Sequence, residues 1–600
     1  MNMSRLLKVL ANKKIINLID FYFSQFISKK NPIVMLVSAC VSFESKNNHI
    51  FLPIEYFEKN CFFSISNKNF IKKILECLKK KINWSLELSK HSSFGNGSII
   101  TPLVLYKGKV YLYKMWKAEK NILERVCQQN SFDESNIKTC LKILNNLFPE
   151  KEYNVQKIAV ALTLINNIVF ITGGPGTGKT TTILKIIIAL IKSYNKIKKI
   201  QLSAPTGKAT KNLIEILKKK WFNDYFCKEE KKKILLHPIT IHQLLGISKT
   251  SEKILFNKKR QLTIDVLIID EASMIDILMM NNILLAVSKT TKIIFVGDHN
   301  QLKPVKSSSI LKDIYYYAEH GYSSKTKSIL EKITQNPIIK NKINKKNTAD
   351  ISDKVCILKK SYRFKKNTGI YMLSNAIRTN KNQVFKKLFQ NSIKNVFFYE
   401  VTSEIKYKNM INIIINNYKK FWKKIHEKRD IKEIINVFKN YQVLCIMRNG
   451  FFGVNFINKV LEEEMYKTNI FDKYFYIKNK LWYIGKPIII TENNKCLGIS
   501  NGEIGITNLS KKNTLQVSFL KKDNIVNDIP VEILKKYETA WSMTVHKAQG
   551  SEFNNVTLIL PNKDLKILKK DILYTGITRT RKQLSIFSKK EIFIKTILQN

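Results

Sequence analysis

Residues Gly173–Thr180 read GGPGTGKT, and this short pattern constrains the fold more than any other part of the chain. It matches GxxxxGKT in full, the pattern of a loop that wraps backbone N–H groups around phosphates. An apolar, β-branched run at 168–172 precedes it, and an amphipathic stretch at 181–192 follows. We therefore predict a strand, a phosphate-binding loop and a helix, the unit from which parallel α/β sheets are built.

The residue types within this loop indicate its ligands. Glycines let the backbone approach a β-phosphate, and the N-terminus of the following helix adds a favourable dipole. Lys179 supplies a positive charge for the β- and γ-phosphates, and the Thr180 hydroxyl is a ligand for Mg²⁺. We expect ATP and Mg²⁺ to bind here, with the nucleotide held by Gly173, Gly174, Pro175, Gly176, Thr177, Gly178, Lys179 and Thr180.

Two carboxylates follow a second apolar run at 266–269. Ligands of parallel α/β sheets bind at the carboxyl ends of the strands, which is where Asp270 and Glu271 are expected to lie. Asp270 is placed to hold the Mg²⁺ shell. Glu271 is the natural candidate to orient and deprotonate the attacking water. The sequence thus predicts ATP hydrolysis.

A third polar turn follows the apolar run at 293–296 and contains Gln301. A glutamine at this edge of the sheet can contact the γ-phosphate and report its presence. Turns rich in Gly, Asp and Asn are common, so the motif is informative only together with the other two.

The chain of 600 residues carries 103 Lys and Arg against 46 Asp and Glu, a formal net charge of +57. A polyanion partner accounts for such an excess, because lysines that neutralise phosphates release counterions. The abundance of Lys, Asn and Ile, which A/T-rich codons encode, accounts for part of it as well. The charge therefore supports a nucleic-acid partner without establishing one.

Cysteine usage and hydropathy favour a cytoplasmic protein. The nine cysteines are dispersed, with no CxxC pair and no histidine cluster at metal-ligand spacing. Reduced thiols are the expectation for such a chain. No apolar run approaches the roughly 18 residues that a membrane span requires.

The pattern of apolar and polar residues divides the chain into three regions. Residues 1–112 mix short helical and strand patterns. In 113–352, and again in 353–600, short apolar strands alternate with amphipathic helices, which is typical of a parallel α/β sheet. We expect a small β-rich insertion near 485–535, and the polar segment 318–352 is predicted to be a mobile loop.

With three such motifs in this order, the chain resembles the superfamily-one helicases, and among them the RecD family, the alpha subunits of exodeoxyribonuclease V. Other segments of the first half carry the likeness, namely NVQK at 154–157, APTGKA at 204–209 and TIHQLL at 240–245. The resemblance implies that Gln156 reads adenine. It also implies that Thr206, Lys208 and His242 contact phosphates of single-stranded DNA. Without the resemblance, Gln156 is an ordinary surface residue and His242 a capping or packing residue.

The second half carries the likeness in KSYRF at 360–364, TVHKAQGSEF at 544–553 and YTGITRTR at 574–581. The resemblance implies that Arg363 and Arg579 face the γ-phosphate as arginine fingers, an effect worth about 10³–10⁵ in rate in other NTPases. It also implies that Glu552 holds the ribose hydroxyls and that Thr544 and His546 contact the DNA strand.

The resemblance implies an α/β fold with two RecA-like parallel-sheet domains, the β-rich insertion in the second, and an N-terminal mixed α/β domain that contacts partners. The implied activity is ATP-dependent 5′→3′ translocation on single-stranded DNA. The implied partners are the beta and gamma subunits of a heterotrimer that acts on double-strand DNA ends in recombinational repair, with the nuclease site on the beta subunit.

Two alternatives stay open at the level of the sequence. The first is a stand-alone superfamily-one ATPase that acts on DNA or remodels RNA–protein complexes. The second is an assembly subunit that binds nucleotide as a structural clamp, without motor activity.

Overall fold

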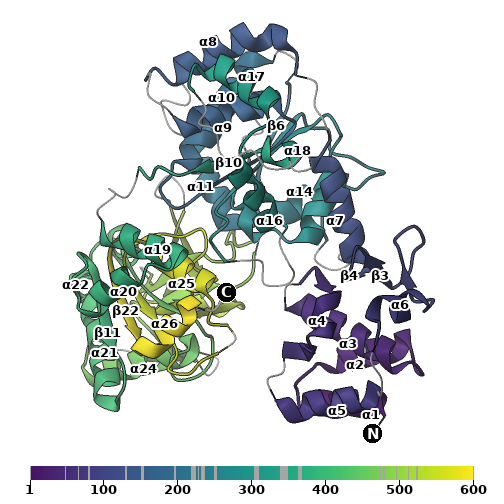
Figure 1. Ribbon diagram of the computed structural model, residues 1–600. Helices are drawn as coiled ribbons and strands as arrows, with labels where there is room; N and C mark the ends of the chain where they lie inside the picture. Colours follow the sequence, from purple (N-terminus) through teal and green to yellow (C-terminus); the bar gives the residue numbers. More distant parts are fainter. Residues whose placement is uncertain are drawn as a thin grey trace.

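The computed structural model describes residues 2–47, 49–64, 67–78, 82–128, 132–150, 154–194, 197–217, 225–226, 229–230, 237–248, 253–302, 310–337, 349–362, 368–471, 474–477, 480–494, 496–510, 512–521, 525–565 and 567–598. Figure 1 shows three parts: an N-terminal part at the lower right, a first α/β part at the top and a second α/β part at the lower left. The predicted class, a mixed α/β fold with parallel sheets, is confirmed.

The N-terminal part is organised around one buried helix, α3 (Pro32–Lys46), whose residues from Val34 to Glu44 are all buried. The Asn31 side chain begins this helix by accepting hydrogen bonds from the N–H groups of the next turn, the usual role of an N-cap. The surrounding elements are α1 (Met3–Asn12), α2 (Leu18–Ile27), β1 (Phe51–Pro53), α4 (Ile54–Glu58), α5 (Lys68–Leu78), α6 (Trp84–Ser89), β2 (Phe94–Gly95), β3 (Leu103–Tyr106) and β4 (Lys109–Leu112).

The first α/β part is built on a parallel sheet with strand order β10-β5-β9-β8-β6-β7. Its strands are β5 (Ile168–Gly173), β6 (Ile200–Ala204), β7 (Ile239–Thr240), β8 (Val266–Ile269), β9 (Lys292–Gly297) and β10 (Val355–Leu358). Its helices are α7 (Tyr113–Val126), α8 (Ile137–Leu147), α9 (Val155–Ile165), α10 (Lys179–Ser193), α11 (Gly207–Leu217), α14 (Ile241–Leu244), α15 (Ile277–Ala286), α16 (Leu311–Tyr316), α17 (Ser324–Thr334) and α18 (Ala349–Ser352).

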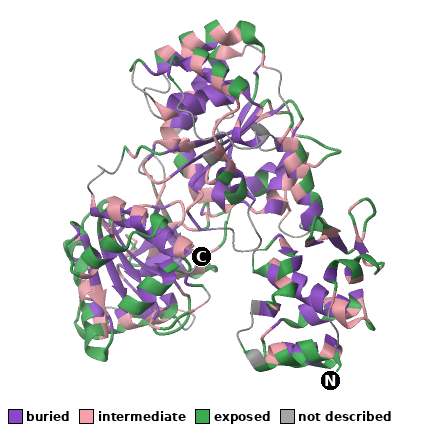
Figure 2. Ribbon diagram, viewed as in Figure 1, coloured by how far each residue is buried: buried purple, intermediate pink, exposed green. Residues whose placement is uncertain are grey.

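Helices cover both faces of this sheet, so its strands are buried (Figure 2) and their sequences are apolar on both sides. Alternation along β5 sends Val169 and Ile171 into the core that contains α9 and α10. Ile168 and Phe170 enter the core on the opposite face, which contains α7 and α15. In that second core the rings of Phe170 and Phe295 stack with centroids 5.1 Å apart. The strand ends are thereby held in a fixed order, which positions the polar turns that follow them.

The end of the first sheet differs from the predicted boundary at 352. β10 runs parallel to β5, with Val355 opposite Phe170 and Leu358 opposite Gly173. Its residues Cys356 and Leu358 are buried in the core of the first part. The sheet of the first α/β part thus extends to Leu358, because β10 covers the edge of β5 that carries the phosphate-binding loop.

The segment predicted to be a polar mobile loop, 318–352, contains a packed helix instead. α17 begins at Ser324, directly after Ser323, whose hydroxyl accepts from the N–H of Thr326. Its residues Ile329, Leu330 and Ile333 are buried in the core that contains α8 and α9. The prediction was wrong because the apolar residues of this helix recur with helical spacing but are outnumbered by the polar residues between them. Residues 338–348 lie outside the described part of the chain.

The second α/β part has a parallel sheet with strand order β11-β22-β21-β12-β20. Its strands are β11 (Val396–Glu400), β12 (Tyr441–Cys445), β20 (Ser542–Thr544), β21 (Phe553–Ile559) and β22 (Thr580–Ser588). Its helices are α19 (Gly369–Thr379), α20 (Asn382–Phe389), α21 (Glu404–Asn417), α22 (Lys419–His426), α23 (Ile431–Phe438), α24 (Val454–Lys467), α25 (Lys570–Ile577) and α26 (Lys590–Leu598).

The β-rich insertion lies between β12 and β20 in the sequence, close to the predicted 485–535. It has an antiparallel sheet with strand order β18-β17-β16-β15-β19 and a hairpin of β13 and β14. The bounds are β13 (Tyr474–Ile477), β14 (Lys480–Tyr483), β15 (Pro487–Ile490), β16 (Ile504–Leu509), β17 (Leu515–Leu520), β18 (Val526–Pro530) and β19 (Tyr537–Thr539). The insertion thus has a small core of its own, in which Trp482 is buried.

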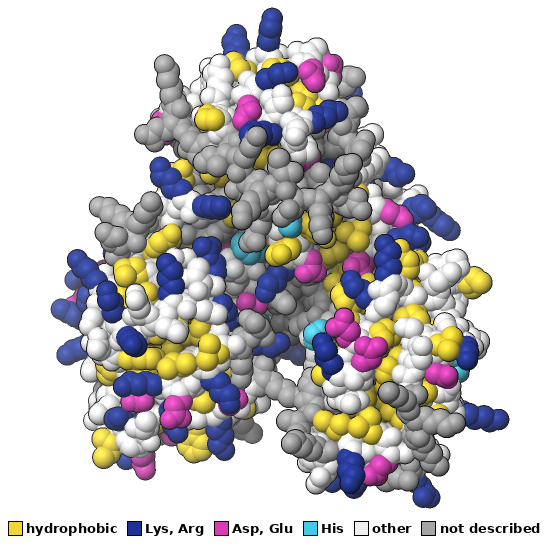
Figure 3. Space-filling view, viewed as in Figure 1, with side chains coloured by type: hydrophobic (Ala, Val, Ile, Leu, Met, Phe, Trp, Pro, Cys, Tyr) yellow, Lys and Arg dark blue, Asp and Glu magenta, His cyan; other side chains and the backbone are white. Residues whose placement is uncertain are grey.

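The positive charge is spread widely. On the face shown in Figure 3, Lys and Arg side chains are scattered over all three parts rather than gathered in one stripe. Among the described residues, no helix combines the length and the hydropathy needed to cross a membrane. The scattered charge agrees with a compositional origin for part of the excess, so function has to be sought in individual sites.

Candidate active site

The phosphate-binding loop lies where β5 ends and α10 begins. The Lys179 ammonium donates hydrogen bonds to the carbonyl oxygens of Gly173, at 2.7 Å, and Gly174, at 3.1 Å. The Thr177 hydroxyl donates to the Gly174 carbonyl at 2.8 Å. No side chain caps the N-terminus of α10, so the N–H groups of its first turn are available to a ligand. The predicted strand, loop and helix are all present.

Close packing explains why two positions in this loop are glycine. Gly178 has a φ of +81°, and a Cβ there would lie 2.2 Å from the Gln156 side-chain nitrogen. A Cβ at Gly173 would lie 2.9 Å from Cβ of Leu358 in β10. Gln156 is buried and donates to the Thr177 carbonyl at 3.1 Å, so its amide braces the loop from behind. A contact between Gln156 and adenine stays a prediction.

A cleft of about 1380 Å³ separates the two α/β parts and is lined by residues of both. Gly173, Gly174 and Thr177 belong to the same loop as the lining glycines. The predicted site residues that line the cleft are Pro175, Gly176, Gly178, Lys179, Thr180, Lys208, Asp270, Glu271, Gln301, Glu552 and Arg579. Residues as far apart in the sequence as Pro175 and Arg579 thus face one space, as a nucleotide site between two domains requires.

The two carboxylates lie at the carboxyl end of β8, as predicted. Asp270 accepts a hydrogen bond from the N–H of Glu271 at 2.8 Å, and Glu271 adopts a left-handed backbone with a φ of +53°. Burial raises the pKa of Asp270 well above its ordinary value, and the neighbouring charge of Glu271 raises it further. An Asp270 carboxyl whose ionisation is opposed by burial fits a divalent cation, which would stabilise the charged form together with the Thr180 hydroxyl oxygen.

The turn after β9 is anchored in the other α/β part. Buried Asp298 accepts from the Gln301 amide at 3.2 Å and from the Tyr574 hydroxyl, which belongs to α25, at 3.3 Å. The N–H of Leu302 donates to the Thr575 hydroxyl oxygen at 2.9 Å. The Leu302 side chain is buried in the core of the second part. This turn therefore connects Gln301 mechanically to the second α/β part.

Asp298 and Tyr574 were missed as site residues, although both lie inside segments that the sequence singled out. The Tyr574 hydroxyl also approaches the phosphate-binding loop, because a Cβ at Gly174 would lie 3.2 Å from it. On the first α/β part, the N–H of His299 donates to the Thr172 hydroxyl oxygen at 3.2 Å. The turn is thus fixed to the end of β5 on one side and to α25 on the other.

Of the two predicted arginine fingers, the structure describes one. Arg579 is 3% exposed, and its guanidinium donates to the carbonyls of Thr575 and Ser551 at 3.1 and 3.2 Å. Arg363 lies outside the described residues. Glu552, predicted to hold ribose hydroxyls, forms an ion pair with Arg581 at 2.9 Å on the rim of the cleft.

Three protein-family models match the chain: the N-terminal domain of RecBCD enzyme subunit RecD at 12–111, an AAA domain at 156–307 and a UvrD-like helicase C-terminal domain at 539–587. The RecBCD enzyme subunit RecD of Buchnera aphidicola subsp. Schizaphis graminum is 76% identical over 602 residues, which cover 100% of both chains. The chain belongs to the RecD family.

More distant RecD relatives match along the same length. The RecD subunit of Haemophilus influenzae is 29% identical over 654 residues, 100% of this chain and 98% of that one. Among solved structures, Bacteroides Pif1 bound to single-stranded DNA is 15% identical and covers 73% of this chain and 93% of that one, with a TM-score of 0.39. Membership of the RecD family implies nucleotide binding, and the phosphate-binding loop on one wall makes the cleft the candidate site.

Lys208, which the RecD resemblance assigned to DNA, lines the nucleotide cleft. Burial lowers its pKa to about 8, and the positive charges of Lys439, Arg579 and Lys211 contribute to the shift. Thr206, from the same segment, caps α11 by accepting from the N–H of Ala209 at 3.2 Å. The structure therefore places Lys208 beside Arg579, at a position from which it can meet an anion of the nucleotide.

The other residues assigned to DNA lie outside the cleft lining. His242 is exposed on α14. Thr544 and His546 line a second, smaller pocket in the second α/β part of this RecD chain. Burial lowers the pKa of His546, so its ring is held in the neutral form. DNA contacts of these residues stay predictions.

Replacing Gly178 by alanine is expected to weaken ATP binding at least tenfold, a loss of about 1.4 kcal/mol. The new Cβ requires a left-handed backbone and displaces the Gln156 amide that braces the loop. Titration with a fluorescent ATP analogue measures the effect. Gly108→Ala is the matched control, because Gly108 has a φ of +70° with no atom within 4 Å of its Cβ position. Equal nucleotide affinities of the two variants would contradict the prediction.

Replacing Tyr574 by phenylalanine is expected to lower kcat of ATP hydrolysis about tenfold with little change in KM. The hydroxyl bonds to a carboxyl group, an interaction worth about 1.5–3 kcal/mol, and its loss frees the turn that carries Gln301. Steady-state ATPase assays on protein saturated with single-stranded DNA measure kcat and KM separately. Tyr476→Phe is the control, since the Tyr476 ring is 71% exposed. A variant with unchanged kcat would show that the turn needs no anchor.

Proposed function

We propose that this RecD-family chain is the ATP-driven helicase subunit of a RecBCD enzyme, moving along single-stranded DNA at the ends of duplexes. The observation that carries the proposal is the split nucleotide cleft. Lys179 from the first α/β part and Arg579 from the second line the same space. A nucleotide bound to both walls draws them together, and its hydrolysis releases them, so each cycle of ATP moves one domain relative to the other.

The residues of the cleft supply the steps of hydrolysis. Lys179 binds the β- and γ-phosphates, and Thr180 with Asp270 would hold Mg²⁺, which neutralises charge on the phosphate oxygens when bound. Glu271, beside Asp270, orients the water and takes its proton. Arg579 stabilises the charge that develops on the transferred phosphoryl group. Arg363 has the same role in the prediction from the sequence.

The two alternatives have less support than the helicase subunit. Relatives named RecBCD enzyme subunit RecD match along the whole chain, which disfavours a stand-alone ATPase. A structural clamp has no use for a general base at Glu271 or for a turn that connects Gln301 to the second α/β part. The 5′→3′ direction and the cytoplasmic location, where chromosomal DNA ends arise, belong to the proposal.

The N-terminal part offers a surface for the beta or gamma subunit. Apolar side chains line one face of α2 at helical spacing: Leu18, Tyr22 and Phe26 are 55, 63 and 82% exposed. Ile19 beside them is 62% exposed. Contiguous exposed apolar side chains of this size mark interaction sites. We infer that this α2 face contacts a partner subunit, which leaves the cleft accessible.

The proposed motor function predicts different outcomes for two substitutions in the cleft. Lys179→Gln is expected to abolish strand-stimulated ATPase and unwinding, because the β/γ-phosphates lose their cation. Glu271→Gln is expected to bind ATP normally but to lower kcat at least 100-fold, because water loses its base. Lys289→Gln, on an exposed loop of the same part, is the control.

Forked substrates test direction in the same assays. Unwinding of duplexes with a 5′ tail and not with a 3′ tail is the expected result. Strand-stimulated ATPase that survives Lys179→Gln would refute the motor, while a preference for RNA strands would favour the remodelling ATPase.

Replacing Tyr22 and Phe26 by serine is expected to abolish co-purification with the beta and gamma subunits and to leave the ATPase of the isolated chain intact. The change removes the two most exposed apolar side chains of the α2 face without entering the core. Ile99→Ser with Ile100→Ser is the matched control, because these residues are 72 and 78% exposed in the same part. If the α2 variant still assembles with the beta and gamma subunits, the interface lies elsewhere on the chain.

A further inference from the structure

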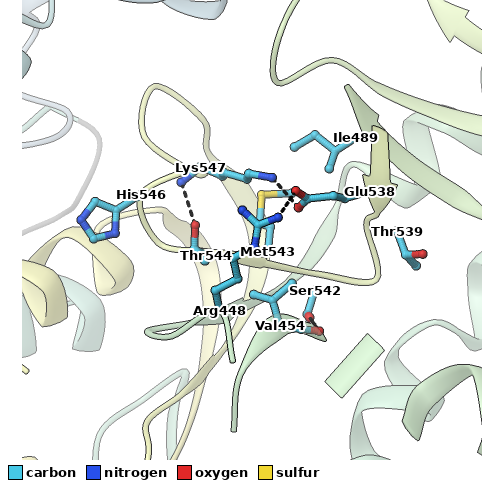
Figure 4. A pocket seen from close by; sticks show the side chains of 10 residues that line it. All are labelled: Arg448, Val454, Ile489, Glu538, Thr539, Ser542, Met543, Thr544, His546 and Lys547. Carbon is cyan, nitrogen blue, oxygen red and sulfur yellow. Dashed lines mark hydrogen bonds and ion pairs between the residues drawn. The ribbon is translucent and has the colours of Figure 1, made fainter. Parts of the chain in front are cut away.

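A second pocket, of about 360 Å³, lies where the β-rich insertion joins the sheet of the second α/β part. Three charged residues from separate segments meet on it (Figure 4): Arg448 follows β12, Glu538 lies in β19 and Lys547 follows β20. Nothing in the proposed hydrolysis of ATP uses this pocket. Its position beside Thr544 and His546 places it on the surface that is predicted to meet the DNA strand.

The three charges form a triad in which one carboxylate is shared. Arg448 donates to one oxygen of Glu538 at 2.5 Å, and the Lys547 ammonium donates to the other at 2.6 Å. Figure 4 shows both cations pointing at the same carboxylate. Two cations against one carboxylate leave a net positive charge. The carboxylate therefore occupies the centre of a site whose charge suits an anion.

Exposure shows that the triad contributes little to the stability of the fold. The side chains of Arg448, Glu538 and Lys547 are 59, 27 and 29% exposed. Ion pairs this accessible to water stabilise a fold by about 0–1 kcal/mol each. A competing anion can therefore displace the Glu538 carboxylate at small cost. An arginine fork and a lysine side by side are the groups that proteins use for phosphate.

The wall next to the triad is apolar. Val454, Ile489 and Met543 line the pocket and are each at most 5% exposed. Figure 4 shows Ile489 on the side of the Glu538 carboxylate, whereas His546 lies beyond Thr544 at the far end. Cations beside an apolar wall match one nucleotide unit of a single strand, whose phosphate is charged and whose base has apolar faces.

We propose that this pocket is a subsite for one nucleotide of single-stranded DNA, in which a backbone phosphate takes the place of the Glu538 carboxylate between Arg448 and Lys547. The proposal rests on the proposed function and names where the strand is gripped in the second α/β part. Glu538 acts as an internal competitor of the phosphate. It holds both cations in position without DNA, and it weakens the grip so that the strand is released at each step.

The salt dependence of strand binding tests the phosphate contact. Each phosphate contact on a single strand contributes a slope of about −0.7 to a plot of log affinity against log salt concentration. Arg448→Gln is therefore expected to lower affinity for a fluorescent oligothymidine and to reduce the slope by about 0.7. An unchanged slope with lowered thermal stability would show that Arg448 only ties the insertion to the sheet, and would overturn the proposal.

Removing the negative charge of Glu538 is expected to change DNA affinity in the opposite direction. Glu538→Gln is expected to raise affinity for the oligothymidine about two- to fivefold, the range of an exposed ion pair. Glu492→Gln is the matched control, since Glu492 forms an exposed ion pair with Lys536 in the same insertion. Affinity that falls or stays equal in Glu538→Gln would overturn the proposal. Wild-type protein that binds no strand at all would instead refute the proposed function.

Discussion

The turn from Asp298 to Leu302 is the contact on which the rest of the functional site depends. It leaves the end of β9 in the first α/β part, and its last residue is buried in the core of the second. Removing a buried leucine from its core costs about 2–5 kcal/mol, so the connection resists separation of the two parts. Asp298 adds a hydrogen bond to α25 through Tyr574. Motion between the parts therefore acts on Gln301, one residue before the anchor.

The residues of the site that the sequence predicted share one property: the chemistry of the ligand demands their type at the end of a strand. Lys179, Asp270 and Glu271 are recognisable because phosphate and Mg²⁺ require them there. The bond between Asp298 and Tyr574 joins residues 276 positions apart and exists only because two domains dock. No local pattern encodes it. For the same reason the sequence did not predict that β10 joins the first sheet, since an isolated apolar strand could pair with an edge of either sheet.

The sequence-based prediction failed where amino-acid composition was given more weight than the spacing of the apolar residues. The lysines of α17 conceal Ile329, Leu330 and Ile333, whose spacing of three and four places them on one buried face. Lys208, which the family motif assigned to DNA, lines the nucleotide cleft, and its contact with DNA stays a prediction. A motif gives the residue type and its strand end, but the direction of a side chain depends on the surrounding fold.

Charge acts differently in the two sites of this chain. In the pocket proposed for the DNA strand, a carboxylate already neutralises one of two cations, so a strand gains little by entering and leaves easily. In the nucleotide cleft, burial lowers the pKa of Lys208 on one wall, and the positive charges of Lys439 and Arg579 on the other wall lower it further. Without a bound anion, these like charges on the two walls repel. A bound triphosphate turns this repulsion into attraction, because both walls then contact a negative charge, and hydrolysis of the triphosphate restores the repulsion. Repulsion between the walls therefore favours opening after each turnover, while the weak grip on the strand lets that opening become movement.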